Sequence, residues 1–110
     1  MKNYKLKKED IKILIDSKEG CIATDRITVD GAKIGYMYRE EPSEKYPDSG
    51  WRFLAGDESQ EYLDNHKNSE VYLLNTICNY DLDIIPYLDA EIGSAFYRNK
   101  RGKFVPDQED

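Results

Sequence analysis

Residues 49–65, SGWRFLAGDESQEYLDN, change from a strand pattern to an acidic, helix-like pattern at their centre. In the first half, Trp51, Phe53 and Ala55 recur at every second position, which is typical of a strand with one buried face. Gly56 follows where the chain would turn. The stretch therefore predicts a joint between a strand and a helix, anchored by the only tryptophan of the chain.

The second half of the stretch predicts a short helix that begins at Asp57. Asp57 and Gln60 have the spacing of a capping box, and Tyr62 and Leu63 would give the helix its apolar contact. Acids in a first helical turn are stabilised by the helix dipole, by about 0.3–1 kcal/mol each. We therefore interpret the local acids as capping residues, with a divalent-cation site as the alternative.

Outward from this joint, the chain reads as short strands mixed with short helices. Ile11, Leu14 and Ile15 have helical spacing, so we expect an N-terminal helix over residues 8–18. The other expected elements are strands at 21–24, 34–39 and 71–74, an exposed loop at 40–49, helical turns at 81–88, a hairpin of 94–97 with 103–105, and a frayed tail at 106–110.

The length of 110 residues fits a single domain, residues 1–110. Its 39% hydrophobic and 35% charged residues are typical of a folded, globular chain. Short turns and irregularly placed helices join the strands, without regular strand–helix–strand alternation. This order predicts an α+β fold with a mainly antiparallel β-sheet, an N-terminal helix and short flanking helices.

Charge and terminal composition argue against several functional classes. The chain has 16 basic and 22 acidic residues, a net charge of −6, and nucleic-acid binders need basic patches to neutralise phosphates. No apolar stretch approaches the roughly 18 residues of a membrane span, and the start lacks the apolar region of a signal peptide. We therefore expect a cytoplasmic protein in which Cys21 and Cys78 are reduced core thiols.

Candidates for catalysis are sparse. His66 is the only histidine and lies in a polar turn, and neither cysteine has a nearby histidine to activate it. Asp81 and Asp83 lack the glycine and the downstream glutamate of a calcium loop. We expect no catalytic residue, no cofactor and no metal, and an enzyme that relies on carboxylates alone is the least favoured alternative.

Trp51 has two interpretations. Its alternation with Phe53 favours a core position, whereas tryptophan, tyrosine and arginine are typical of binding hot spots. Arg52 would lie on the opposite face of the strand, where a partner could contact it. The candidate partner-binding residues are Trp51, Arg52, Asp57, Glu58, Glu61, Tyr62 and Asp64.

Three stretches taken together resemble one bacterial family. They are GCIATDRITVDGAKIGYMYREEP at 20–42, DSGWRFLAGDESQEYLDN at 48–65 and VYLLNTICNYDLDIIPYLDAEIGSAFYR at 71–98. The chain resembles the immunity protein thirty-three family of bacterial polymorphic toxin systems, first described as a domain of unknown function. The likeness covers about residues 20–98. It implies a small cytosolic protein that binds a cognate protein toxin and blocks it without catalysis.

The sequence thus favours a binding protein whose acidic surface would approach a basic toxin surface by charge complementarity. The alternative is a stand-alone cytosolic domain that binds a small ligand or a regulatory partner. A deep pocket lined by Trp51, tyrosines and carboxylates would favour that alternative. No nucleic acid, no membrane and no particular oligomeric state is predicted.

Overall fold

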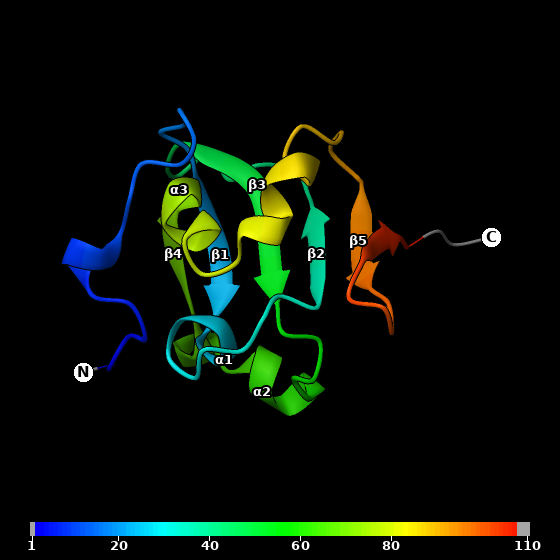
Figure 1. The fold of residues 1–110 in the computed structure, drawn as a ribbon, viewed down its shortest axis with the longest axis horizontal. Coiled ribbons are helices and arrows are strands. Elements are labelled where there is room, and N and C mark those ends of the chain that lie inside the picture. The colour runs from blue at the N-terminus through cyan, green and yellow to red at the C-terminus, as the bar shows by residue number, and fades with distance from the viewer. Residues whose placement is uncertain (1, 108–110) are drawn as a thin grey trace.

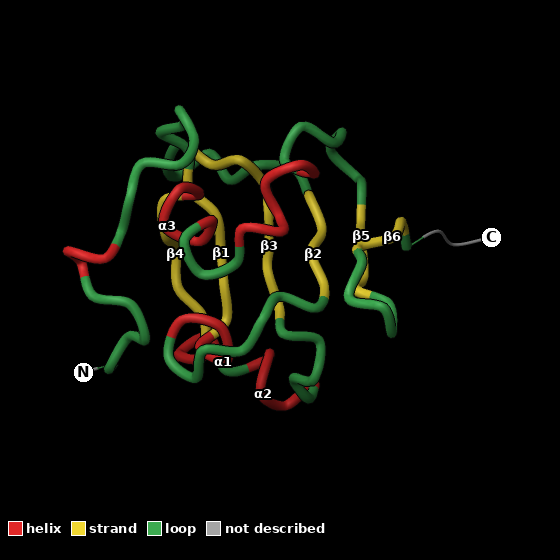
Figure 2. The backbone as a smooth tube through the Cα atoms, viewed as in Figure 1, coloured by secondary structure: helices red, strands yellow, loops and turns green. Residues whose placement is uncertain are grey.

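A six-stranded sheet runs through the protein in a computed structural model that describes residues 2–107 (Figures 1 and 2). The strand order is β4-β1-β3-β2-β5-β6. The strands are β1 (Gly20–Thr24), β2 (Tyr36–Arg39), β3 (Asp48–Leu54), β4 (Ser69–Leu73), β5 (Ala95–Arg98) and β6 (Phe104–Pro106). The helices are α1 (Asp25–Thr28), α2 (Gln60–Asp64) and α3 (Leu74–Cys78), with 3-10 turns η1 (Lys8–Asp10), η2 (His66–Asn68) and η3 (Leu82–Tyr87).

The sheet is mixed but mainly antiparallel. β1 and β3 pair in parallel, whereas the other four pairs of neighbours are antiparallel. The parallel pair arises because the chain passes through α1 and β2 before it returns as β3 beside β1. The predicted α+β fold with a mainly antiparallel sheet is confirmed.

One face of the sheet packs against α1, α3 and η3; in Figure 1, α3 lies in front of the strands and α1 lies at the lower end of β1. Trp51 is 0% exposed on this face, its ring stacks on Phe53 with centroids 6.1 Å apart, and its Nε1 donates to the Leu88 carbonyl at 3.1 Å. The alternation in residues 51–55 therefore marks the core face. The buried core consists of Cys21, Ala23, Ile27, Ile34, Met37, Trp51, Phe53, Leu74, Ile77, Cys78, Ile84 and Phe104.

The expected N-terminal helix over residues 8–18 is wrong beyond its first turn. Only Lys8–Asp10 is helical, as η1, and residues 11–14 and 16–19 have no regular structure. Of the three residues with helical spacing, Leu14 is 38% exposed and neither Ile11 nor Ile15 is fully buried, so the spacing does not mark a buried helix face. Asn75 of α3 and its C-cap residue Asn79 hold residues 12–15 instead, through side-chain hydrogen bonds to the backbone of this segment.

Helix α2 begins at Gln60 and is capped by Ser59, not by Asp57. The Ser59 Oγ accepts the N–H of Tyr62 at 3.1 Å. Asp57 pairs with Arg26 of α1 instead. The capping-box prediction was therefore misplaced by two residues, because a long-range ion pair takes the acid that the local pattern assigned to the helix.

Strand β4 lies at an edge of the sheet, which corrects the expected buried strand at 71–74. Val71 and Leu73 are 52% and 55% exposed, because they project from the face of the sheet opposite the core, whereas Tyr72 between them packs against the core. Leu74 is buried, but it begins α3. Sequence reasoning missed α3 and α1, since helices of four or five residues are too short for a periodic pattern.

The C-terminal half follows the expectation more closely. The helical turns at 81–88 are η3 with Pro86 inside it, and the predicted hairpin is β5 with β6. Asp107 donates its N–H to the Ala95 carbonyl at 2.8 Å, so the start of the expected frayed tail is attached to the sheet. Residues 108–110 of that tail lie outside the described residues.

Candidate functional site

The face of the sheet opposite the core is only partly covered. The strand register places Ile22 beside Val71, and Tyr36 between Leu54 and Tyr97, on this face. None of these side chains is fully buried. We define the open face as the side chains of Ile22, Tyr36, Tyr38, Leu54, Val71, Leu73 and Tyr97.

Side chains of α2 and of the open face together line an open hollow of about 310 Å³. Ile22, Leu54 and Leu63 contribute apolar walls to this hollow. Glu40 and Asp64 contribute carboxylates. The hollow therefore combines aliphatic surface with negative charge, a combination that suits an apolar side chain next to a basic group.

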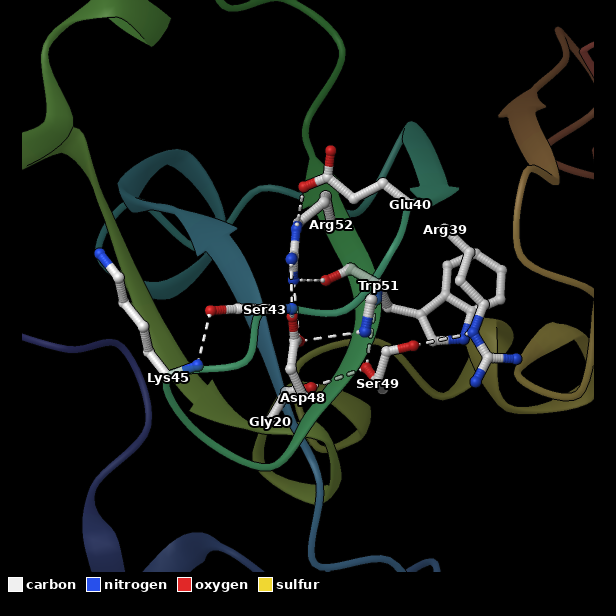
Figure 3. A network of polar contacts seen from close by, with 10 residues as sticks. Gly20, Arg39, Glu40, Ser43, Lys45, Asp48, Ser49, Trp51 and Arg52 are labelled. Atoms are coloured by element: carbon white, nitrogen blue, oxygen red, sulfur yellow. Dashed lines mark hydrogen bonds and ion pairs between the residues drawn. The ribbon is translucent and has the colours of Figure 1, made fainter.

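Arg52 also lines the hollow, but its charge is neutralised within the protein (Figure 3). The Arg52 Nε donates to Glu40 at 2.6 Å, and Nη1 and Nη2 donate to the two carboxylate oxygens of Asp48 at 3.0 and 2.8 Å. Asp48 further accepts the N–H groups of Ser43 and Gly50 at 2.7 and 3.0 Å. This network attaches the 40–47 loop to β3, so we interpret it as structural.

The network also fixes the protonation of Asp48. Burial by itself would raise the pKa of this carboxyl. The hydrogen bonds from Arg52 and from the backbone of Ser43 and Gly50 outweigh burial and lower the pKa of Asp48 to about 2. Asp48 is therefore ionised at neutral pH, which rules it out as a general acid there.

Trp51 and Arg52, two of the candidate partner-binding residues, are buried. Trp51 is 0% exposed and Arg52 is 5% exposed. Trp51 therefore lies in the core, the position that its alternation with Phe53 favoured. Arg52 does point to the opposite face, as expected, but its guanidinium donates its hydrogen bonds to Glu40 and Asp48 within the protein.

Asp57 and Glu58 are used to build the turn between β3 and α2. Asp57 accepts two hydrogen bonds from the Arg26 guanidinium, at 3.0 and 2.6 Å, and this ion pair holds the pKa of the Asp57 carboxyl below its usual range. Glu58 accepts the N–H groups of Ala55 and Gly56, both at 2.8 Å. These two acids therefore have structural partners.

The three candidate partner-binding residues on α2 are Glu61, Tyr62 and Asp64, and they have different surroundings. Asp64 lines the hollow and accepts a hydrogen bond from Gln60 at 2.8 Å. Glu61 is exposed and has no hydrogen bond or ion pair within residues 2–107. Tyr62 is half-buried, and burial, followed by the nearby charges of Asp25 and Asp30, raises the pKa of its phenol. The structure thus brings together Arg52 and Asp64 but not the seven candidates as one site.

A second, shallower depression of about 550 Å³ continues the open face past Leu54. It joins Tyr36 and Tyr97 to the turn that carries Asp57 and Glu58. Tyr36 also donates its hydroxyl to Asp107 at 2.9 Å. Aromatic and acidic side chains therefore do meet on one surface, although the tyrosines come from β2 and β5 and not from the strand of Trp51.

The family model described as the Immunity protein Imm33 domain matches residues 21–108. The chain belongs to the Imm33 family. The matched range covers all six strands except the first residue of β1, Gly20. It includes both the open face and α2. No curated protein and no solved structure was found to match the chain.

Sequence reasoning missed the Imm33 open face itself, including Ile22 and Leu54, and the place of Leu63 beside it. The signal was present in part, because Tyr36 and Tyr38 alternate with the buried Met37. That pattern shows which side chains share a face, but it does not tell which of two faces is covered by helices. The exposure of Val71 required the strand order, which no local pattern contains.

The histidine, cysteine and carboxylate side chains in the described part of this Imm33 domain do not gather into a metal site. Among the described residues, no group of three or more histidine, cysteine, aspartate or glutamate side chains is placed to hold a metal ion. Cys21 and Cys78 are buried free thiols, and burial raises the pKa of Cys78 to about 11 and that of Cys21 further. Within residues 2–107, no helix has the length and apolarity to cross a bilayer.

Proposed function

We propose that this Imm33 protein binds and neutralises a cognate protein toxin in the bacterial cytoplasm, and that the toxin docks on the open face. The observation that carries the proposal is the combination of uncovered aliphatic and aromatic side chains with carboxylates around the hollow. Family membership supports an immunity role in general. The proposal adds the surface and its chemistry.

The apolar part of the open face supports a protein partner. Val71, Leu73 and Tyr97 are exposed large side chains on this face, and Leu63 of α2 is exposed beside them. A protein interface gains most of its free energy where such side chains enter a desolvated contact. Tyrosine suits this role because it offers a rigid ring with a polar end.

The charges of the hollow support a basic partner surface. Glu40 and Asp64 are accessible, whereas Arg52, the only cation among residues 2–107 that lines the hollow, is buried and paired. A negative surface accelerates association with a positive one and repels acidic competitors. The toxin surface we expect is therefore basic at its rim and apolar at its centre.

The small-ligand alternative is favoured by one observation, the size of the hollow. About 310 Å³ lies at the lower end of the range for small-molecule sites. However, Trp51, which the deep pocket of this alternative would have included, lies in the core. We therefore place the toxin-binding function first, and its test separates the two.

Co-expression with the proteins encoded beside the gene tests this function. The wild-type chain should restore growth to cells that express the toxic neighbour and should bind that neighbour when purified. Val71→Glu should abolish rescue, because it places a charge in the apolar part of the open face. Ile13→Glu is the matched control, since it changes an equally aliphatic and more exposed side chain off that face.

Charge reversal on α2 tests the electrostatic part. Glu61→Lys with Asp64→Lys should lower the association rate with the toxic neighbour about tenfold at low salt and less at high salt. Glu9→Lys with Asp10→Lys is a matched control of equal charge change on η1. Failure of every neighbouring protein to be neutralised would overturn the function. Rescue by Val71→Glu would overturn only the assignment of the open face.

A further inference from the structure

Strand β4 forms one edge of the sheet, with β1 as its neighbour (Figure 1). In such an antiparallel pair, the backbone groups of successive residues alternate between the neighbouring strand and the free edge. The N–H of Leu74 donates to the carbonyl of Glu19 at 2.9 Å, directly before β1, so this N–H points away from the free edge. By alternation, the N–H of Leu73 and both backbone groups of Val71 point toward the free edge.

The hydrogen bonds of β1 support this assignment. Gly20, the register partner of Leu73, donates its N–H to the Pro47 carbonyl at 2.7 Å, on the side of β3 and not of β4. The carbonyl of Leu73 belongs to the start of α3, where Leu73 is the N-cap. Within residues 2–107, the Leu73 N–H and the N–H and C=O of Val71 have no hydrogen-bond partner. We define these three groups as the open edge.

The opposite edge of the sheet is protected against strand addition. β6 has three residues, and the N–H of Asp107 donates to the Ala95 carbonyl at 2.8 Å, so the alternation turns Pro106 outward. Proline has no N–H to offer, and natural sheets use it to block their edges. β4 contains no proline, and its register with β1 runs without a shift. The two edges of the sheet therefore differ in what they offer to an extended chain.

The open edge is continuous with the open face. The side chains of Val71 and Leu73 belong to the open face, and these residues are 52% and 55% exposed. A strand paired with β4 would lie about 4.8 Å from it and would direct every second side chain to the same face. One extended segment of a partner therefore reaches both the backbone of the edge and the side chains of the face.

We propose that the cognate toxin adds an extended strand to β4, a mode of docking that rests on the toxin-binding function proposed above. The added strand donates an N–H to the Val71 carbonyl, and its own carbonyls accept the N–H groups of Val71 and Leu73. Its side chains on the open face are aliphatic, because they lie beside Val71 and Leu73.

Charge favours a toxin strand over a second copy of this chain at the open edge. Two copies would bring together net charges of −6 each, and like charges oppose association. Glu70, within β4 itself, adds a carboxylate whose side chain is 42% exposed. The basic toxin surface expected for the open face is attracted by the same charges.

Leu73→Pro removes one donor of the open edge without breaking a hydrogen bond inside the described chain. The φ of Leu73 is −64°, which proline adopts without strain. Leu73→Ala is the matched control, since it removes the side chain and keeps the N–H. Circular dichroism verifies that both variants are folded. Leu73→Pro should weaken binding of the co-encoded toxic neighbour at least about tenfold more than Leu73→Ala does, measured by titration calorimetry. Equal losses would overturn strand addition.

Amide hydrogen exchange of the wild-type chain tests the same contact without a substitution. In the free chain, the N–H groups of Val71 and Leu73 should exchange rapidly, whereas the N–H of Tyr72, which faces β1, should be protected. Saturation with the toxic neighbour should slow exchange at Val71 and Leu73 at least about tenfold, because an added strand accepts both N–H groups.

The outcomes separate strand addition from the proposed function. Binding and rescue with unchanged exchange at Val71 and Leu73 would overturn strand addition and leave the toxin-binding function intact. Failure of every neighbouring protein to bind would overturn the function, and strand addition with it. Protection of the two amides in the free chain that increases with its own concentration would assign the open edge to a second copy and overturn the toxin strand.

Discussion

Asp48 and Arg52 are separated by four residues on β3, yet they form a two-pronged ion pair with N–O distances of 3.0 and 2.8 Å. In a straight strand these positions would lie about 13 Å apart. The register explains the contact, because Asp48 and Arg52 face Gly20 and Ile22, which are only two residues apart on β1. The two extra residues form a bulge at Gly50, where φ is +88°.

Gly50→Ala should therefore destabilise the fold strongly. A side chain at this φ costs roughly 1–3 kcal/mol, and the added Cβ would lie 2.2 Å from the Glu40 carbonyl oxygen. We expect a loss of more than about 3 kcal/mol in the free energy of unfolding, measured in urea. Gly102→Ala is the matched control. Gly102 has φ +78° but no neighbouring atom within 4 Å, so a loss equal to that of Gly50 would contradict this reading.

Arg52→Met should cost about 3–5 kcal/mol, because it leaves the Asp48 carboxylate buried without its charged partner. Adding Asp48→Asn to Arg52→Met should restore part of that loss, since the uncompensated charge is then gone. Urea denaturation of the wild type, both single variants and the double variant measures the coupling. Additive losses in the double variant would show that the two residues stabilise the protein independently.

The low pKa of Asp48 makes the free energy of unfolding depend on pH in the acidic range. Its pKa is about 2 in the folded chain and about 3.9 when unfolded, so the unfolded state takes up the proton first. The stabilisation is complete above about pH 4 and is lost as pH falls toward 2, on the order of 2 kcal/mol in all. Urea midpoints between pH 5 and 2 should fall less steeply in Asp48→Asn than in wild type. Parallel slopes would contradict this assignment.

Trp51 should report on the core and not on a partner. Trp51→Ala should cost about 3–5 kcal/mol, the range for deleting a large buried ring. The emission of the wild-type chain should be that of a buried indole, and it should not shift when the toxic neighbour binds. A red-shifted spectrum or a small loss of stability would instead favour the interface interpretation of Trp51.

Local sequence patterns predicted the elements whose formation depends on residues close together in the sequence. The strand around Trp51 and Phe53, the hairpin near Gly102 and the helical turns with Pro86 all follow from short-range spacing and turn residues. The α+β class follows from the order of these elements. Family membership followed from longer stretches of residues, and a family match of 21–108 bears it out.

Long-range contacts account for what the sequence did not predict. Residues 11–18 have helical spacing, but Asn75 and Asn79, some sixty residues away, hold their backbone in another conformation. Asp57, which we expected to cap the helix, forms an ion pair with Arg26. Arg52, which we expected on the binding surface, forms an ion pair with Asp48. For residues 11–18 and for Asp57 the partner is distant in the sequence, whereas Asp48 reaches Arg52 because of the bulge at Gly50.

The most direct measurement of the central claim is methyl NMR of the chain labelled at isoleucine, leucine and valine, titrated with the co-encoded toxic neighbour. We expect shifts at Ile22, Leu54 and Val71 of the open face and at Leu63 of α2 beside it, and none at the exposed methyl groups of Ile13 and Leu82. Shifts confined to Ile13 and Leu82, with the open face unchanged, would contradict it.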